Sequence, residues 1–128
     1  MDLIIILKAL GDENRLRILN LLRNEQLCVG DLETILGMTQ SNVSRHLAKL
    51  KNSDMITQRK KAQWVFYQIN QSLIRRHPIL LEFLYKEMDK MAQCKKDLER
   101  LRNYRQKLCD LDKSEPIIPI NGLLNSEL

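Results

Sequence analysis

Apolar residues recur at helical spacing in the first part of the chain. Residues 3–10 are predicted to form a short helix that ends at Gly11, and Asp12 offers a side-chain cap for the next helix. That helix, over residues 13–23, carries leucines spaced three residues apart, which gives it one apolar face. The pattern therefore predicts two short amphipathic helices in succession.

The next two helices are separated by a glycine. Residues 31–36 have an apolar stripe and stop at Gly37, which accepts a left-handed backbone. Thr39 then offers a hydroxyl cap for a helix over residues 40–51. A short helix, a glycine turn and a capped helix are typical of a helix-turn-helix.

The pattern changes to that of β-strands after the fourth helix. Residues 55–59 and 64–69 are rich in β-branched and aromatic side chains and are predicted to pair as a β-hairpin. The connecting residues 60–63 include two lysines, which makes the tip basic. Pro78 suits the first turn of a long last helix over residues 79–111.

The last helix carries a long apolar stripe. A small subunit has little core left to cover it, so we interpret the stripe as a dimer surface. Residues 1–111 are expected to form one domain and residues 112–128 an irregular tail. The predicted fold class is mainly α with a β-hairpin wing, a winged helix-turn-helix with a long C-terminal dimerisation helix. The stripe consists of Leu80, Leu84, Met88, Met91, Cys94, Leu98, Leu101 and Leu108.

Composition and charge agree with this interpretation without deciding it. The chain has 128 residues and a formal net charge of +5, a mild surplus that is compatible with a polyanionic partner. It shows no secretory signal and no apolar run of the roughly 20 residues that cross a membrane, so we expect a cytoplasmic protein without a membrane partner. Its cysteines are then expected to be reduced thiols.

The fourth helix has a polar face opposite its apolar one. Val43, Leu47 and Leu50 share the face that is expected to be buried. The opposite face has hydrogen-bonding side chains and no acid, and such a helix can contact base edges and phosphates in the major groove of DNA. The alternative is an ordinary solvated face. The candidate DNA-binding residues of this segment are Thr39, Gln40, Ser41, Asn42, Ser44, Arg45, His46 and Lys49.

The tip of the hairpin is the second candidate element. Arg59, Lys60 and Lys61 are placed to meet phosphate or the minor groove if the hairpin serves as a wing. The alternative is that these charges protect an exposed strand from aggregation. Together, the polar helix and the basic tip favour duplex DNA as the partner. RNA is less favoured, because the sequence offers no exposed aromatic platform.

Three segments resemble one protein family in order and spacing. Residues 7–19 (LKALGDENRLRIL), 39–47 (TQSNVSRHL) and 64–67 (WVFY) resemble the opening, the recognition helix and the second wing strand of ArsR/SmtB-type repressors. The resemblance implies a homodimer built from the first and last helices, and a repressor that leaves an inverted-repeat operator when an inducer binds. Ala62 departs from the pattern, because the family usually has glycine at the wing tip. The dimer residues assigned on this basis are Leu3, Ile6, Leu7, Leu84, Met88, Met91 and Leu98.

The resemblance also implies a sensor site for an inducer, and in this site the sequence departs further from the family pattern. Relatives that sense arsenite have a Cys-Val-Cys-Asp-Leu segment, whereas this chain has Cys28 and then Gly30 in place of the second thiol. A soft trivalent ion prefers three thiolates, which here would be Cys28, Cys94 and Cys109. The last two lie about 22 Å apart along one helix, so a shared site needs the last helix of a second subunit, a bend, or Cys28 brought near. If the last helices of two subunits pack antiparallel, Cys94 of one faces Cys109 of the other. The alternatives are thiol redox sensing and three structural thiols.

The sequence also bears on enzyme activity, other metal sites and the inducer. The sequence has no nucleophile elbow, phosphate loop or paired His-and-Glu zinc motif, so we do not expect an enzyme. No histidine follows His77, so the zinc or nickel site of other relatives is missing. The main alternative to a DNA-binding regulator is a protein-interaction module with a coiled-coil helix. We expect that no cofactor is needed for folding, and that arsenite or another soft metal ion is the inducer.

Overall fold

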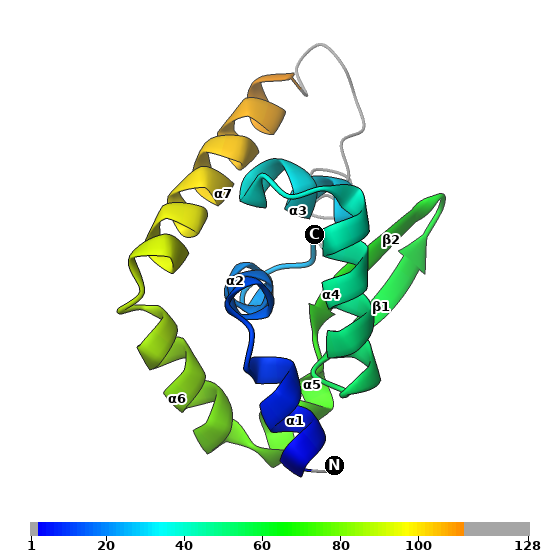
Figure 1. Cartoon of the computed structure of the whole chain (residues 1–128). Coiled ribbons are helices and arrows are strands. Elements are labelled where there is room, and N and C mark those ends of the chain that lie inside the picture. The colour runs from blue at the N-terminus through cyan, green and yellow to red at the C-terminus, as the bar shows by residue number, and fades with distance from the viewer. Residues whose placement is uncertain (1–2, 112–128) are drawn as a thin grey trace.

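The computed structural model describes residues 3–111 and has a mainly helical fold with one β-hairpin, as predicted (Figure 1). The predicted tail, residues 112–128, lies outside the described residues. The elements in chain order are α1 (Leu3–Leu10), α2 (Glu13–Leu22), α3 (Val29–Leu36), α4 (Gln40–Asn52), β1 (Ile56–Lys61), β2 (Trp64–Ile69), α5 (Gln71–Arg76), α6 (Pro78–Met88) and α7 (Ala92–Leu111).

The caps that the sequence predicted set the helix boundaries. The side chain of Asp12 accepts a hydrogen bond from the Arg15 N–H at 3.1 Å at the start of α2. Thr39 does the same at the start of α4, where its hydroxyl accepts from the Asn42 N–H at 3.2 Å. Gly37 has a φ of 67°, the left-handed conformation that ends α3. The helix-turn-helix formed by α3 and α4 is therefore confirmed.

The hairpin turns over two residues. β1 and β2 pair antiparallel, and Lys61 lies opposite Trp64, so that the turn consists of Ala62 and Gln63. Lys60 and Lys61 therefore belong to β1 rather than to a loop. Ala62 has a φ of 55°, which a side chain with a Cβ adopts at a cost of about 1–2 kcal/mol. The glycine that the family usually has near this point would relieve that strain.

Helix α2 occupies the centre of the molecule. Figure 1 shows it end-on, with α4 and the hairpin on one side and α6 and α7 on the other. Ile18 and Leu19 on this helix are fully buried. The Arg17 Nε donates to Asp97 Oδ2 at 2.8 Å and ties α7 to this centre. The core thus joins the helix-turn-helix to the C-terminal helices.

The prediction of one long last helix over residues 79–111 is wrong in one respect. The chain forms two helices there, α6 and α7, with a break at Asp89, Lys90 and Met91. Arg23, the residue that follows α2, contacts this break: it donates to Asp89 at 2.6 Å, and its guanidinium lies over the Tyr85 ring at 5.2 Å. A further short helix, α5, was not predicted.

The apolar stripe also differs from the prediction. We expected it to lack partners within one subunit, but Met88, Cys94, Leu101 and Leu108 are buried in the chain's own core. Leu84, Met91 and Leu98 are half-buried and pack against the same core. Ile6 is buried too, so it and Met88 are wrong as exposed dimer contacts. The cause is α7, which folds back over α2 and α3 instead of projecting outward.

The exposed apolar side chains lie elsewhere. Leu3 and Leu7 on α1 are 64% and 54% exposed, and Ile79 and Phe83 on α6 are 79% and 60% exposed. Both helices lie at the lower end of the molecule in Figure 1. Over residues 3–111, none of the helices combines the length and apolar character that a membrane span requires.

Candidate nucleic-acid interface

The polar face of α4 points to solvent as expected. Val43, Leu47 and Leu50 are buried and anchor the helix to the core. The residues of the opposite face are exposed, and between residues 39 and 53 there is no acidic side chain. This surface can therefore approach a polyanion without charge repulsion. Its exposed members are Thr39, Gln40, Ser41, Asn42, Ser44, Arg45 and Lys49.

Two of these side chains are already oriented by each other. The Arg45 Nη2 donates to Asn42 Oδ1 at 3.1 Å, and the backbone of Asn42 is held by the Thr39 cap. Arginine can bind guanine and asparagine can bind adenine through paired hydrogen bonds in the major groove. The cap therefore holds two side chains of types that can bond to base edges near the N-terminal end of α4, the part of a recognition helix that meets bases.

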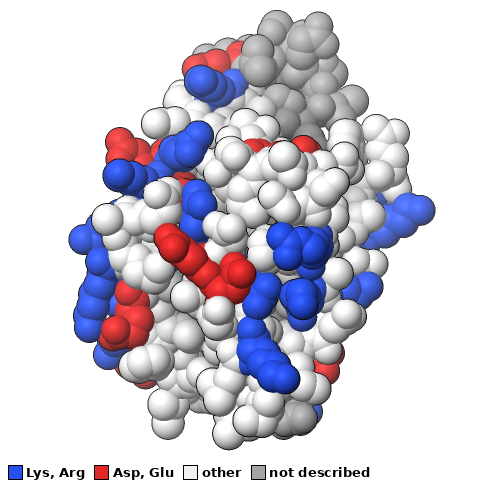
Figure 2. All heavy atoms as spheres, in the orientation of Figure 1, with Lys and Arg blue, Asp and Glu red and all other residues white. Residues whose placement is uncertain are grey.

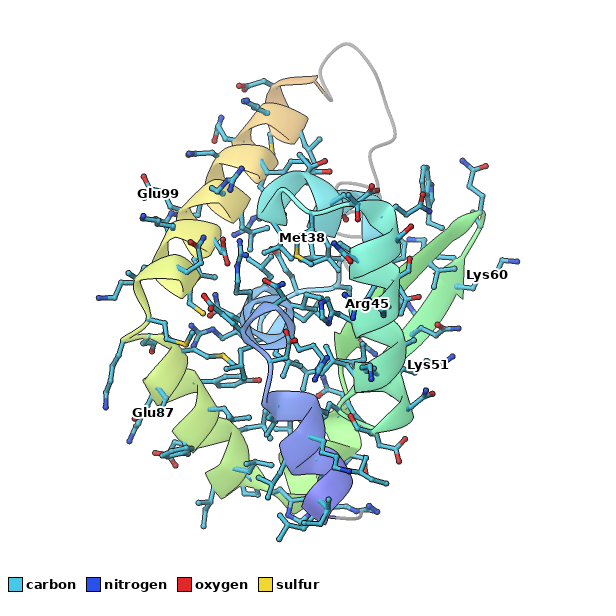
Figure 3. The ribbon with its side chains drawn as sticks, in the orientation of Figure 1. Met38, Arg45, Lys51, Lys60, Glu87 and Glu99 are labelled. Atoms are coloured by element: carbon cyan, nitrogen blue, oxygen red, sulfur yellow. The ribbon has the colours of Figure 1, made fainter. Side chains whose placement is uncertain are left out.

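Basic side chains continue from α4 onto the hairpin. Figure 2 shows Lys and Arg side chains over both elements on one face of the molecule. In Figure 3, Arg45 and Lys51 on α4 and Lys60 on the hairpin lie on one side. On the opposite side, where Glu87 and Glu99 are labelled, basic and acidic side chains are mixed (Figure 2). Arg59 and Lys60 are exposed and Lys61 is half-buried. The helix and the hairpin thus form one positive surface.

Sequence reasoning missed one residue of this surface. Lys51 is exposed in the last turn of α4, next to a segment that was already assigned to DNA binding. Lysine near a helix C-terminus is expected on electrostatic grounds alone, which made this residue uninformative in the sequence. Its position on the basic surface is visible only once α4 is placed beside the hairpin (Figure 3).

The assignment of His46 to DNA binding is wrong. Its side chain is 2% exposed and faces the core, because its position on α4 lies between the apolar Val43 and Leu50. Its Nδ1 lies 3.3 Å from Nη1 of Arg15 on α2. His46 therefore packs on the inner side of the recognition helix.

Arg15 connects three helices at this point. Its Nε donates to the Ala9 carbonyl at 2.6 Å and its Nη2 to the Lys8 carbonyl at 2.9 Å, which satisfies the C-terminal end of α1. Asp12 lies 3.7 Å from Nη1 and balances the charge. Through Arg15, the end of α1 is joined to the inner side of α4.

The contact also defines the state of His46. A guanidinium group has only donors, so Nδ1 must be the acceptor and the ring must be neutral, with its proton on Nε2. Burial lowers the pKa of His46 below its ordinary value; nearby Arg45, Arg15 and Lys49 act in the same direction, and Asp12 opposes them. A protonated ring would set two cations against each other.

The thiols are divided between different environments. Cys28 is the N-cap of α3, which begins two residues earlier than predicted, and it is buried beside Phe66. Burial, with the neighbouring Asp31 carboxylate, raises the pKa of the Cys28 thiol to about 11. Cys94 is 1% exposed within the subunit, and burial raises its pKa as well. Both thiols are therefore protonated at neutral pH.

The three thiols do not form a metal site within one subunit. Cys109 is exposed, unlike the other two. In the described part of the chain, no three His, Cys, Asp or Glu side chains come together in a way that could hold a metal ion. Cys94 faces its own core and not the outside of α7, so the expected pairing of Cys94 with Cys109 of a second subunit does not fit this structure.

Comparisons with known proteins agree with the geometry. A family model described as "Bacterial regulatory protein, arsR family" matches residues 12–58. The transcriptional activator HlyU of Vibrio cholerae is 39% identical over 82 residues, which are 64% of this chain and 76% of that protein. The arsenical resistance operon repressor of Escherichia coli K12 is 34% identical over 110 residues, covering 84% of this chain and 88% of that protein. A homodimeric winged helix-turn-helix DNA-binding domain from Mycobacterium bovis, Mb0332, superimposes with a TM-score of 0.57 at 28% identity, covering 65% of this chain and 77% of that one.

Proposed function

The chain belongs to the arsR family of bacterial regulatory proteins, and on that premise we propose that it is a repressor which binds an inverted-repeat operator as a homodimer. The family membership makes it a DNA-binding transcriptional regulator with a winged helix-turn-helix. The observation that carries the proposal is the surface formed by α4 and the hairpin, which has exposed basic and hydrogen-bonding side chains and no acidic one. An apolar inner face holds α4 to the core.

In the proposed complex, the N-terminal end of α4 enters the major groove. Asn42, Ser44 and Arg45 contact base edges or nearby phosphates, and Lys49 contacts the phosphate backbone. Arg59, Lys60 and Lys61 place the hairpin against the phosphates beside the groove. Thr39, Gln40 and Ser41 lie at the helix N-terminus, where backbone N–H groups favour a phosphate.

The dimer surface that we propose differs from the one expected from sequence. It combines the exposed apolar residues of α1 with those of the first half of α6, including Leu7 and Phe83. Exposed apolar side chains of this size are rarely grouped on a monomer, and they mark association surfaces. The relative from Mycobacterium bovis is described as homodimeric, which supports a dimer here.

The inducer is the less determined part of the proposal. The named relatives include an arsenical resistance repressor, so arsenite or another soft ion is a candidate. The thiols of this chain do not fit such an ion within one subunit, because no metal-binding group of side chains forms in the described residues and the buried Cys28 thiol is protonated. Replacing Cys28, Cys94 and Cys109 singly by serine tests the candidate, because a thiolate sensor must lose its response to arsenite in at least one variant.

We also propose that residues 1–111 act as one domain, that the protein is cytoplasmic and that it is not an enzyme. The core supports the first point, since α2 joins the helix-turn-helix to α6 and α7. The known relatives are transcriptional regulators, which supports the other two.

The direct test is selection of duplexes from a random pool by the purified chain, followed by sequencing. We expect an enriched inverted repeat whose half-sites are about one helical turn apart. The variant Arg45→Ala should select it poorly, whereas Lys95→Ala, an exposed change on α7, should select it like the parent. Selection of no common sequence would contradict the proposal.

A further inference from the structure

A pocket of about 380 Å³ lies where the helix-turn-helix, the wing and α7 meet. The N-terminal turn of α3 forms one wall through residues 28–31. The start of β2 contributes Trp64 and Val65, and α7 contributes Tyr104. The volume is within the range of small-molecule sites in proteins, which is roughly 300–1,000 Å³.

The Asp31 and Tyr104 side chains that line this pocket are already engaged in hydrogen bonds. The Tyr104 hydroxyl donates to Asp31 Oδ1 at 2.6 Å, and the Cys28 N–H donates to Asp31 Oδ2 at 3.0 Å. Asp31 is 1% exposed, so its charge faces inward. This buried carboxylate disfavours an anionic ligand, and because both of its oxygens have donors, it offers little to a cation.

The remaining walls are apolar. Trp64 is half-buried and packs against Cys28 and Phe66, which presents a flat aromatic surface at the pocket. Burial keeps the Cys28 thiol protonated, so it acts here as a small apolar group rather than as a nucleophile or metal ligand. Ligand pockets of this kind are lined mainly by apolar and aromatic groups, and they bind molecules with a matching apolar surface.

We propose that this pocket is an effector site for a neutral, flat, apolar small molecule. The proposal has a binding half, that such a molecule occupies the pocket, and an effector half, that its occupancy changes DNA affinity. Only the effector half rests on the proposed DNA-binding function. A ligand there lies between α3 and β2, the two parts that must keep a fixed spacing for α4 and the hairpin to contact one duplex together. It also lies beside the hydrogen bond that joins α7 to α3. Occupancy therefore changes DNA affinity by changing that spacing.

The sequence supplies a specific probe, because Trp64 is the single tryptophan of the chain. Nitrobenzene, a neutral flat quencher, is titrated into the DNA-free protein while the tryptophan fluorescence is recorded. The matched control is 4-nitrobenzoate, which has the same ring and a negative charge. We expect saturable quenching by nitrobenzene and only linear, collisional quenching by 4-nitrobenzoate. Linear quenching by both compounds would overturn the binding half of the proposal.

Two variants test whether the quenching comes from the pocket. Gly30→Leu adds a side chain at a lining residue, where its Cβ would meet Cys28 Sγ at an ordinary 3.8 Å. Thr34→Leu places the same side chain one turn later on α3, at a residue that does not line this pocket, and removes the bond from the Thr34 hydroxyl to the Gly30 carbonyl. We expect at least a tenfold weaker nitrobenzene affinity for Gly30→Leu and parental affinity for Thr34→Leu. Equal affinity in both would overturn the assignment, and the parental titration decides the binding half even if Gly30→Leu does not fold.

The effector half is read separately with operator DNA. We expect saturating nitrobenzene to change the parent's affinity for the operator at least fivefold and to leave that of Gly30→Leu unchanged. Saturable binding without any change in affinity would overturn the effector role. If the parent bound no duplex at all, the proposed function would fail while the fluorescence titration still decided the ligand site.

Discussion

Arg15 on α2 and His46 on α4 lie in contact beneath the recognition helix, with Nη1 of the arginine 3.3 Å from Nδ1 of the histidine. Both side chains are buried, at 9% and 2% exposure. The same guanidinium group holds the last carbonyls of α1, a helix of the proposed dimer surface. The orientation of α4 is thereby linked to the end of α1 through a single charged group.

This contact predicts a dependence of stability on pH. The pKa of His46 is lowered by folding, so between that value and the ordinary value of 6.5 the unfolded chain binds a proton that the folded chain does not. The stabilisation is complete above the unfolded pKa and is lost as the pH falls toward and through the folded one. The free energy of unfolding, measured with urea at constant protein concentration, should fall as the pH drops below the ordinary histidine pKa of 6.5.

Replacement of His46 separates this effect from that of the carboxylates. In His46→Asn, the amide oxygen takes the position of Nδ1 and can still accept from Arg15, but it does not titrate. We expect a smaller loss of stability on acidification than in the parent. The control is His77→Asn, a change at an exposed histidine, which should keep the parental loss. An identical loss in all three proteins would show that the contact does not titrate.

Loss of the Arg45 side chain should weaken operator binding without affecting the fold. Arg45 is exposed and donates to Asn42 on the same helix, so Arg45→Ala removes no core contact. We expect a loss of about 1–3 kcal/mol in binding, measured by fluorescence anisotropy, and an unchanged thermal midpoint. Ser44→Ala should act in the same direction. Parental binding by both variants would place the base-reading surface elsewhere.

The turn of the hairpin offers a stabilising change. Ala62 has a positive φ, so Ala62→Gly removes strain of about 1–2 kcal/mol, against about 0.4–1 kcal/mol of added chain entropy in the unfolded state. We expect a net gain of about 0.5–1 kcal/mol in the free energy of unfolding. Gln63→Gly, at the other turn residue, should bring no gain, because Gln63 has no positive φ and therefore no such strain to relieve. A loss of stability in Ala62→Gly would contradict the strain argument.

The dimer should depend on α1 and α6. Phe83→Glu or Leu7→Glu places a charge on the exposed apolar face. Each buried apolar side chain contributes about 1.5–3 kcal/mol, so we expect the dimer dissociation constant to rise at least about tenfold in sedimentation experiments. Gln106→Glu, an exposed change on α7, should leave it unchanged. A dimer weakened by Gln106→Glu but not by Phe83→Glu or Leu7→Glu would place the interface on α7 instead.

Local signals in the sequence were sufficient for most of the fold. Asp12, Gly37 and Thr39 act through their immediate neighbours, and the structure has each of them in its predicted role. The break between α6 and α7 has no such signal, because no glycine or further proline lies between Pro78 and the end of α7. The contact between Asp89 at this break and Arg23 joins residues that are distant in sequence, so helical periodicity alone predicted one continuous helix.

The site was predictable where exposure decided the role and not where tertiary contacts did. Arg45 and Lys49 follow from helical spacing alone. His46 is polar and sits beside them in sequence, but Arg15 satisfies it from inside. Cys94 was assigned to a dimer surface because the sequence does not show that α2 packs against this part of α7. In the structure, the Asn20 side chain of α2 donates to the Cys94 carbonyl at 3.1 Å.

The central claim is that α4 and the hairpin bind duplex DNA as one basic surface, and the salt dependence of operator affinity tests it most directly. We expect log K to fall linearly with log salt concentration, with a slope of about −0.9 for each phosphate neutralised. Lys60→Ala on the hairpin should reduce that slope by about one contact per subunit and weaken specific and competitor duplexes alike. Lys95→Ala on α7 should leave the slope unchanged. An affinity that does not depend on salt, or a slope that Lys60→Ala does not alter, would contradict the account.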